Sequence, residues 1–142
     1  MENLPSWAAD YIGLEFESRG RGPKKFDCWG LVRYIYYRQF NIILPSYVDK
    51  YTDAGNEKDV SNLILMDNER LNWINIVIGL EKVGDLILLR MKREPTHIGL
   101  VLTKSTFLHI HTGIGSVVQM YNEVRWEKRV IGFYRHIRML DE

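Results

Sequence analysis

The chain has 142 residues, 46% of them apolar and 12% aromatic, which suits one domain with a substantial hydrophobic core. Its 19 basic and 18 acidic residues give a net charge of +1, so the basic excess of a dedicated duplex-DNA binder is missing. A single cysteine excludes an internal disulfide and a four-cysteine zinc site, and no apolar run approaches the ~18 residues of a membrane span. We therefore expect one domain over residues 1–142 that binds no nucleic acid and inserts into no membrane.

The first half of the chain carries helix and turn signals. Glycine and basic residues make 18–25 a loop, and residues 41–56 are rich in turn formers. Residues 57–78 have an apolar pattern that predicts one or two further helices. The predicted helices are Ser6–Gly13, Asp27–Gln39, Asp59–Met66 and Asn68–Ile78.

From Val83 onward the hydrophobic pattern changes to the alternation of strands. Breaks fall at Pro95, at residues 104–105 and at two glycines near residue 114. Helices followed by a run of antiparallel strands are typical of an α+β fold. The predicted strands are Asp85–Met91, His97–Thr103, Thr106–Thr112, Ser116–Tyr121 and Ile131–Ile137.

Cys28 stands at the start of a predicted helix, directly after Asp27, a residue type that caps helix N-termini well. At 100° per residue, Cys28 shares a face with Leu31, Val32 and Ile35. The positive end of the helix favours the thiolate and lowers the pKa of a thiol below its free value of ~8.5. The alternative is a small buried hydrophobe, the commonest role of a lone cysteine on an apolar helix face.

His109 and His111 share one face of their strand, and the loop before them decides where His97 lies. A three-residue loop centred on Thr103 pairs His97 with His109, whereas one centred on Lys104 pairs His97 with His111 and makes His109 the diagonal neighbour. A two-residue loop would place His97 and His109 on opposite faces. We expect one of the three-residue loops.

A thiol nucleophile needs a base, and the base needs a group that orients it. His97 can take the proton of Cys28, His109 can orient His97, and the Cys28 backbone amide can stabilise an oxyanion. His109 and His111 with Cys28 or His97 also have zinc-compatible donor atoms, but no ligand spacing supports a metal, and we assign neither metal nor cofactor. We expect His136 to be an ordinary surface residue of its strand.

Three motifs resemble, in order, those of the NlpC/P60 cysteine peptidases, a papain-like family. Phe26–Val32 resembles the nucleophile motif, Val83–Leu88 the Pro-Gly-Asp-Leu strand, and His97–Leu102 with Phe107–His109 the two histidine strands. The resemblance implies a papain-like α+β fold whose N-terminal helices, with the nucleophile helix among them, pack on an antiparallel sheet of about five strands.

The same resemblance implies that Cys28 is the nucleophile, His97 the base and His109 the orienting residue. The implied reaction is the hydrolysis of amide bonds in the stem peptides of bacterial peptidoglycan. We expect the stem peptide to contact Arg21, Trp29, Asp27 and His111, although Trp29 is more simply explained by packing and the basic loop by solvation.

Trp29, the Gly20–Pro23 loop and Leu44–Tyr47 most resemble the phage-tail branch of this family. That branch implies a chain made in the cytoplasm without a signal peptide, carried in the virion on tail-tip proteins, and acting at the periplasmic cell wall. The alternatives are a catalytically silent tail-tip or plug component and an amidase or acyltransferase acting on another substrate. Phe16 stands where many relatives have a tyrosine that assists the oxyanion, and Tyr11 is a candidate substitute.

Overall fold

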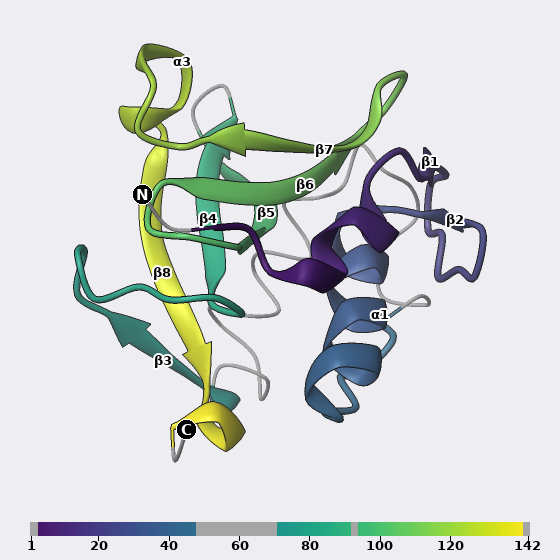
Figure 1. Cartoon of the computed structure of the whole chain (residues 1–142), viewed down its shortest axis with the longest axis horizontal. Coiled ribbons are helices and arrows are strands. Elements are labelled where there is room, and N and C mark those ends of the chain that lie inside the picture. Colours follow the sequence, from purple (N-terminus) through teal and green to yellow (C-terminus); the bar gives the residue numbers. More distant parts are fainter. Residues whose placement is uncertain (1–2, 48–70, 92–93, 141–142) are drawn as a thin grey trace.

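The computed structural model describes residues 3–47, 71–91 and 94–140. A six-stranded sheet in the order β3-β8-β4-β5-β6-β7, antiparallel throughout, forms the centre of the fold, and α1 lies against it (Figure 1). The strands are β3 (Trp73–Ile76), β4 (Leu86–Met91), β5 (Glu94–Val101), β6 (Thr106–His111), β7 (Gly115–Met120) and β8 (Val130–His136). The other elements of the described residues are a small parallel strand pair, two helices and two 3-10 helices: η1 (Ser6–Tyr11), β1 (Glu15–Phe16), β2 (Lys25–Phe26), α1 (Cys28–Phe40), α3 (Val124–Glu127) and η4 (Ile137–Met139).

The predicted helix at residues 27–39 is confirmed as α1, within one residue at each end. Asp27 is its N-cap and accepts a hydrogen bond of 2.7 Å from the Gly30 amide. Asn41 closes the other end with a φ of 56°, the left-handed conformation that asparagine tolerates at a helix C-terminus. Local sequence signals therefore account for both ends of the helix that carries the cysteine.

Hydrophobic side chains cover both faces of the sheet. The larger cluster lies between the sheet and α1, and includes Leu31 and Ile35 of the helix with Ile98 and Leu108 of the strands. The smaller cluster contains Ile87, Leu89, Val101, Phe107, Tyr121, Trp126 and Phe133. The alternation of side chains along β5 and β6 explains the division, since neighbouring residues of a strand point to opposite faces.

The five predicted strands are confirmed with shifted ends, but the sheet has six strands because the helix predicted for Asn68–Ile78 is wrong. Residues 73–76 form β3, which pairs with β8 from Trp73↔His136 to Ile76↔Phe133. Its Trp-Ile-Asn-Ile sequence has the β-branched content of a strand, and pairing with a distant segment outweighs local helical periodicity. The helix predicted for Asp59–Met66 lies outside the described residues.

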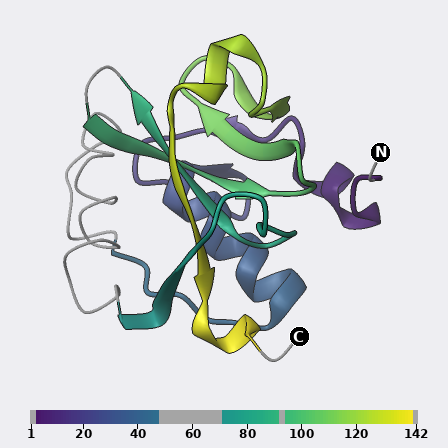
Figure 2. The same cartoon turned by 90° about the vertical axis from the view of Figure 1, so that its left-hand side faces the viewer.

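The C-terminal strand β8, yellow in Figure 2, lies inside the sheet between β3 and β4. Arg135 of β8 binds both carboxylate oxygens of the buried Asp85, at 2.7 Å and 2.8 Å. His136 is buried rather than at the surface as expected, because its ring packs edge-on against Trp73 at a centroid distance of 4.9 Å. Within the residues described, no helix has the length and apolar character needed to cross a membrane.

Candidate active site

A loop between β5 and β6 brings three histidines together. The register pairs Leu100 with Leu108 and Val101 with Phe107, which centres the loop on Lys104. This confirms the second of the two predicted loops, in which His97 faces His111. The His97 and His111 rings stack at a centroid distance of 4.6 Å and an angle of 18°.

His109 is the diagonal neighbour of His97 and is hydrogen-bonded to it. The Nε2 atom of His97 lies 2.8 Å from Nδ1 of His109, and both residues are buried. A side chain at Gly99 would obstruct this arrangement, because a Cβ there would lie 3.3 Å from the His109 Cβ and 2.7 Å from the Phe107 ring. Gly99 of β5 thus leaves room for the His109 side chain.

Gln119 of β7 extends the pair into a chain of three groups. Its Oε1 lies 2.5 Å from Nε2 of His109. A carbonyl oxygen only accepts, so Nε2 of a neutral His109 holds the proton and Nδ1 accepts from Nε2–H of His97. The lone pair of His97 is then on Nδ1. Gln119 was not predicted as a site residue, although it is a polar residue between Val118 and Met120 on the strand after the histidine strand.

The surroundings of His109 keep it neutral. The pKa of His109 is lowered from 6.5 to about 3, mainly by burial and also by the neighbouring His97 and His111, while the hydrogen bond to Gln119 opposes the shift. The indole of Trp126, on α3, packs edge-on against the ring with centroids 5.3 Å apart. A neutral, buried imidazole orients its partner without adding charge.

Cys28 occupies the first position of α1, and only 2% of its surface is exposed. It belongs to the cluster between α1 and the Ile98 face of the sheet, whereas His97 and His109 belong to the face that carries Phe107 and Trp126. α1 packs against both β5 and β6, and the ladder between these strands consists of two pairs, ending at Leu100↔Leu108. Near His97 and His109, β5 and β6 are therefore not paired with each other, although His97 pairs with Leu89 of β4 and His109 with Val117 of β7.

Arg21 and Asp27 hold the start of α1 in place. Nη1 of Arg21 lies 2.9 Å from Oδ1 of Asp27, and its other guanidinium nitrogens donate to the Ser46 carbonyl at 2.7 Å and 2.9 Å. A Cβ at Gly30 would lie 1.9 Å from the Gly20 carbonyl oxygen, so the first helical turn sits directly on this loop. These contacts join both residues to the protein itself, and their predicted contact with a stem peptide stays a prediction.

Trp29 is fully buried, and its indole N–H donates to the Pro45 carbonyl at 2.8 Å. Its ring lies 5.8 Å from that of Tyr47. Packing, the simpler of the two roles considered for Trp29, accounts for these contacts; a contact with substrate stays a prediction.

Tyr11 does not replace the family tyrosine at the start of α1. Its hydroxyl accepts a hydrogen bond of 2.6 Å from Gln39. Gln39 is eleven residues after Cys28 on the same helix, about 16 Å along the axis at 1.5 Å per residue. The Tyr11 hydroxyl therefore belongs to the far end of the helix.

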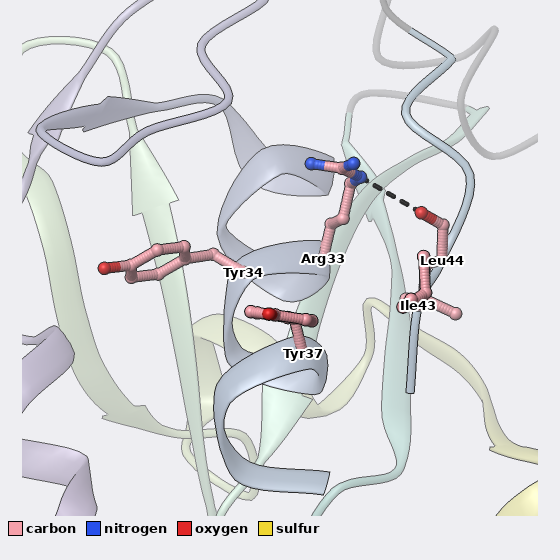
Figure 3. A pocket seen from close by; sticks show the side chains of 5 residues that line it. All are labelled: Arg33, Tyr34, Tyr37, Ile43 and Leu44. Atoms are coloured by element: carbon pink, nitrogen blue, oxygen red, sulfur yellow. Dashed lines mark hydrogen bonds between the residues drawn. The ribbon is translucent and has the colours of Figure 1, made fainter. Parts of the chain in front are cut away.

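Of two surface hollows, one lies away from the histidines and the other is lined by His111. A cavity of about 330 Å³ beside α1 is lined by Arg33, Tyr34, Tyr37, Ile43 and Leu44, none of which is a predicted site residue (Figure 3). Another, of about 360 Å³, is lined by His111, Ile114, Val117, Val118, Gln119, Arg125 and Trp126. The second hollow contains His111 and the amide that orients His109.

Comparisons with known proteins agree with this architecture. The model of the NlpC/P60 family matches residues 13–135. The Escherichia coli K12 protein named murein DD-endopeptidase MepS/murein LD-carboxypeptidase is 27% identical over 121 residues, which are 85% of this chain and 55% of that protein. The chain thus spans about half the length of the curated relatives that it matches.

Solved structures show the same fold. A Staphylococcus aureus protein described as similar to a lipoprotein of the NLP/P60 family superposes with a TM-score of 0.64 at 24% identity, over 92% of this chain and 39% of that one. The NlpC/P60 domain of the peptidoglycan hydrolase SagA gives a TM-score of 0.57 at 22% identity, over 91% of this chain and 92% of that domain.

Proposed function

Since the chain belongs to the NlpC/P60 family, we propose that it is a cysteine peptidase that hydrolyses amide bonds in the stem peptides of peptidoglycan. The observation that carries this proposal is the hydrogen-bonded series His97–His109–Gln119, in which Nε2 of His97 donates to His109 and the lone pair of His97 is on Nδ1. The relative named as a murein endopeptidase supports the class of substrate.

The reaction begins when Nδ1 of His97 takes the proton of the Cys28 thiol. The thiolate attacks the carbonyl carbon of the scissile amide, and the backbone N–H of Cys28 at the helix start stabilises the oxyanion. The His97 imidazolium then gives its proton to the leaving amine, which departs as the C–N bond breaks. Water, deprotonated by His97, hydrolyses the thioester and restores the thiol.

The finer proposal is that the enzyme travels on a phage tail and opens the wall locally, with tail-tip proteins as its partners. It rests on the resemblance of residues 20–23, Trp29 and residues 44–47 to that branch. Arg21, Asp27, Trp29 and His111 are the proposed contacts of the stem peptide. The test is co-purification of the chain with intact virions, detected by an antibody to the chain.

Burial favours one other candidate, a structural component that keeps the fold without catalysis. Cys28 is 2% exposed and His97 is fully buried, so a substrate would have to displace covering groups to reach them. An amidase or acyltransferase that acts on another substrate would use the same residues. Measuring turnover of a panel of other amides and acyl acceptors distinguishes such an enzyme from a peptidoglycan peptidase.

The deciding experiment incubates purified sacculi and a stem tetrapeptide with the wild type, Cys28→Ala and the matched control His136→Gln. We expect peptide products from the wild type and the control, and none from Cys28→Ala. Mass spectrometry should find the acyl group on Cys28. Equal product release by the wild type and Cys28→Ala would overturn the peptidase proposal, and the absence of products from all three would favour the structural component.

A further inference from the structure

The proposed proton path from Cys28 to Gln119 uses His97 and His109 but not His111, so it does not explain why a third histidine stands beside them. One nitrogen of each ring of His97, His109 and His111 lies within 4.8 Å of the others. We propose that these three residues bind a divalent transition metal ion such as Zn²⁺, and that the bound ion switches the hydrolase off.

The geometry is close to that of a zinc site. Zinc–nitrogen bonds of about 2.0–2.1 Å at a tetrahedral angle place ligand nitrogens about 3.4 Å apart. The nitrogens of the cluster need to converge by at most about 1.4 Å from their 4.8 Å limit, a shift that rotations of the imidazole rings supply. Three histidines with water in the fourth position are an accepted zinc set.

The ligands are of the right chemical type, and the surroundings hold them. Imidazole nitrogens suit zinc, copper and nickel, whereas calcium and magnesium prefer oxygen. Trp126 lies 5.3–6.4 Å from all three rings and forms an apolar wall beside them. Cys28 is not a member of this group of nitrogen ligands among the described residues, so the site does not depend on the thiol.

An ion can enter from the side of His111. That residue is only partly buried and lines the hollow of about 360 Å³ together with Gln119 and Trp126. Ile114 on the same rim is 68% exposed, which places the hollow at the surface.

Binding and catalysis exclude each other because both nitrogens of His109 are already used. Nδ1 is hydrogen-bonded to His97 and Nε2 to Gln119, so an ion on either nitrogen displaces one of these partners. The bond that orients His97, or the one that selects the proton position on His109, is then lost. The inhibition rests on the proposed function, whereas the binding does not.

The test is calorimetric titration of the purified chain with Zn²⁺ alone at pH 7.5, for the wild type, Cys28→Ala, His111→Ala and His136→Gln. We expect one ion per chain in the wild type, unchanged binding in Cys28→Ala and His136→Gln, and at least 30-fold weaker binding in His111→Ala. Circular dichroism of each variant checks that it is folded. No binding at 0.1 mM Zn²⁺, or binding that Cys28→Ala abolishes and His111→Ala retains, overturns the site.

The inhibition is measured separately on the stem tetrapeptide. Zn²⁺ should stop hydrolysis in the concentration range of the calorimetric binding, and excess EDTA should restore it. Zinc bound to an active enzyme that continues to turn over would refute the switch while leaving the metal site intact. Zinc bound to a protein without hydrolase activity would instead count against the proposed function.

Discussion

Replacement of Gln119 by leucine should impair catalysis although the residue touches neither the thiol nor the reacting amide. Leucine keeps the approximate volume but removes the acceptor of the 2.5 Å hydrogen bond from His109. His109 is then free to hold its proton on Nδ1 and donate it to His97. In that arrangement His97 carries its own proton on Nδ1 and cannot accept the one from Cys28.

The size of the effect follows from the hydrogen bond that is lost. Leaving a buried donor without its acceptor costs about 1–3 kcal/mol, and His109 is 1% exposed. If this free energy is what holds His109 in the productive proton arrangement, the competent fraction falls about 5- to 150-fold. We therefore expect kcat/KM to fall within that range and KM to change little.

The assay is hydrolysis of the stem tetrapeptide followed by chromatography, with the pH profile of Cys28 alkylation by iodoacetamide as a second readout. Gln119→Glu is the matched control, because its carboxylate restores an acceptor; it should recover most of the activity that Gln119→Leu loses. The thiolate should form at higher pH in Gln119→Leu than in the wild type. A kcat/KM within twofold of the wild type, with an unchanged alkylation profile, would refute the relay.

Three further predictions concern stability. Gly30→Ala should lower the free energy of unfolding by about 2 kcal/mol or more in urea titration, because its Cβ would lie 1.9 Å from the Gly20 carbonyl oxygen, and unchanged stability would contradict the close contact. Asp85→Asn breaks the buried ion pair with Arg135 and should cost about 3 kcal/mol by the same method; Asp85→Asn in an Arg135→Leu background should cost less, and an equal cost in both would argue against the pairing. The pKa of His109 is about 3 in the folded chain and about 6.5 in the unfolded chain, so between these values only the unfolded chain takes up this proton. The free energy of unfolding should therefore fall by about 2 kcal/mol between pH 6.5 and 5. In His109→Asn this part of the pH dependence should vanish, and an identical pH dependence in the variant would contradict the pKa shift.

Local signals were sufficient for the elements that carry the site. Asp27 before an apolar helical pattern predicted α1, and the alternation of apolar residues predicted the strands, because caps and side-chain periodicity depend on neighbours a few residues away. Alternation with a three-residue loop also placed His97, His109 and His111 on one face. The motifs themselves were specific enough to indicate the family that the family model confirms.

The sequence did not distinguish between the two loop centres, and it did not identify the groups that surround the histidines. Thr103 and Lys104 were equally good centres, since the choice depends on how β5 and β6 pack. Gln119 and Trp126 were missed because their contacts with His109 join residues of different elements.

By itself, the sequence determined the family, the helix that begins at Cys28 and the shared face of the three histidines, since each depends on short-range patterns. Only the tertiary structure decided that Trp73–Ile76 is a strand, that Arg21 is tied to Asp27, and that His109 has Gln119 as its acceptor. These features depend on pairing and packing between segments far apart in the chain, and the free energy of such contacts cannot be predicted from a local sequence pattern.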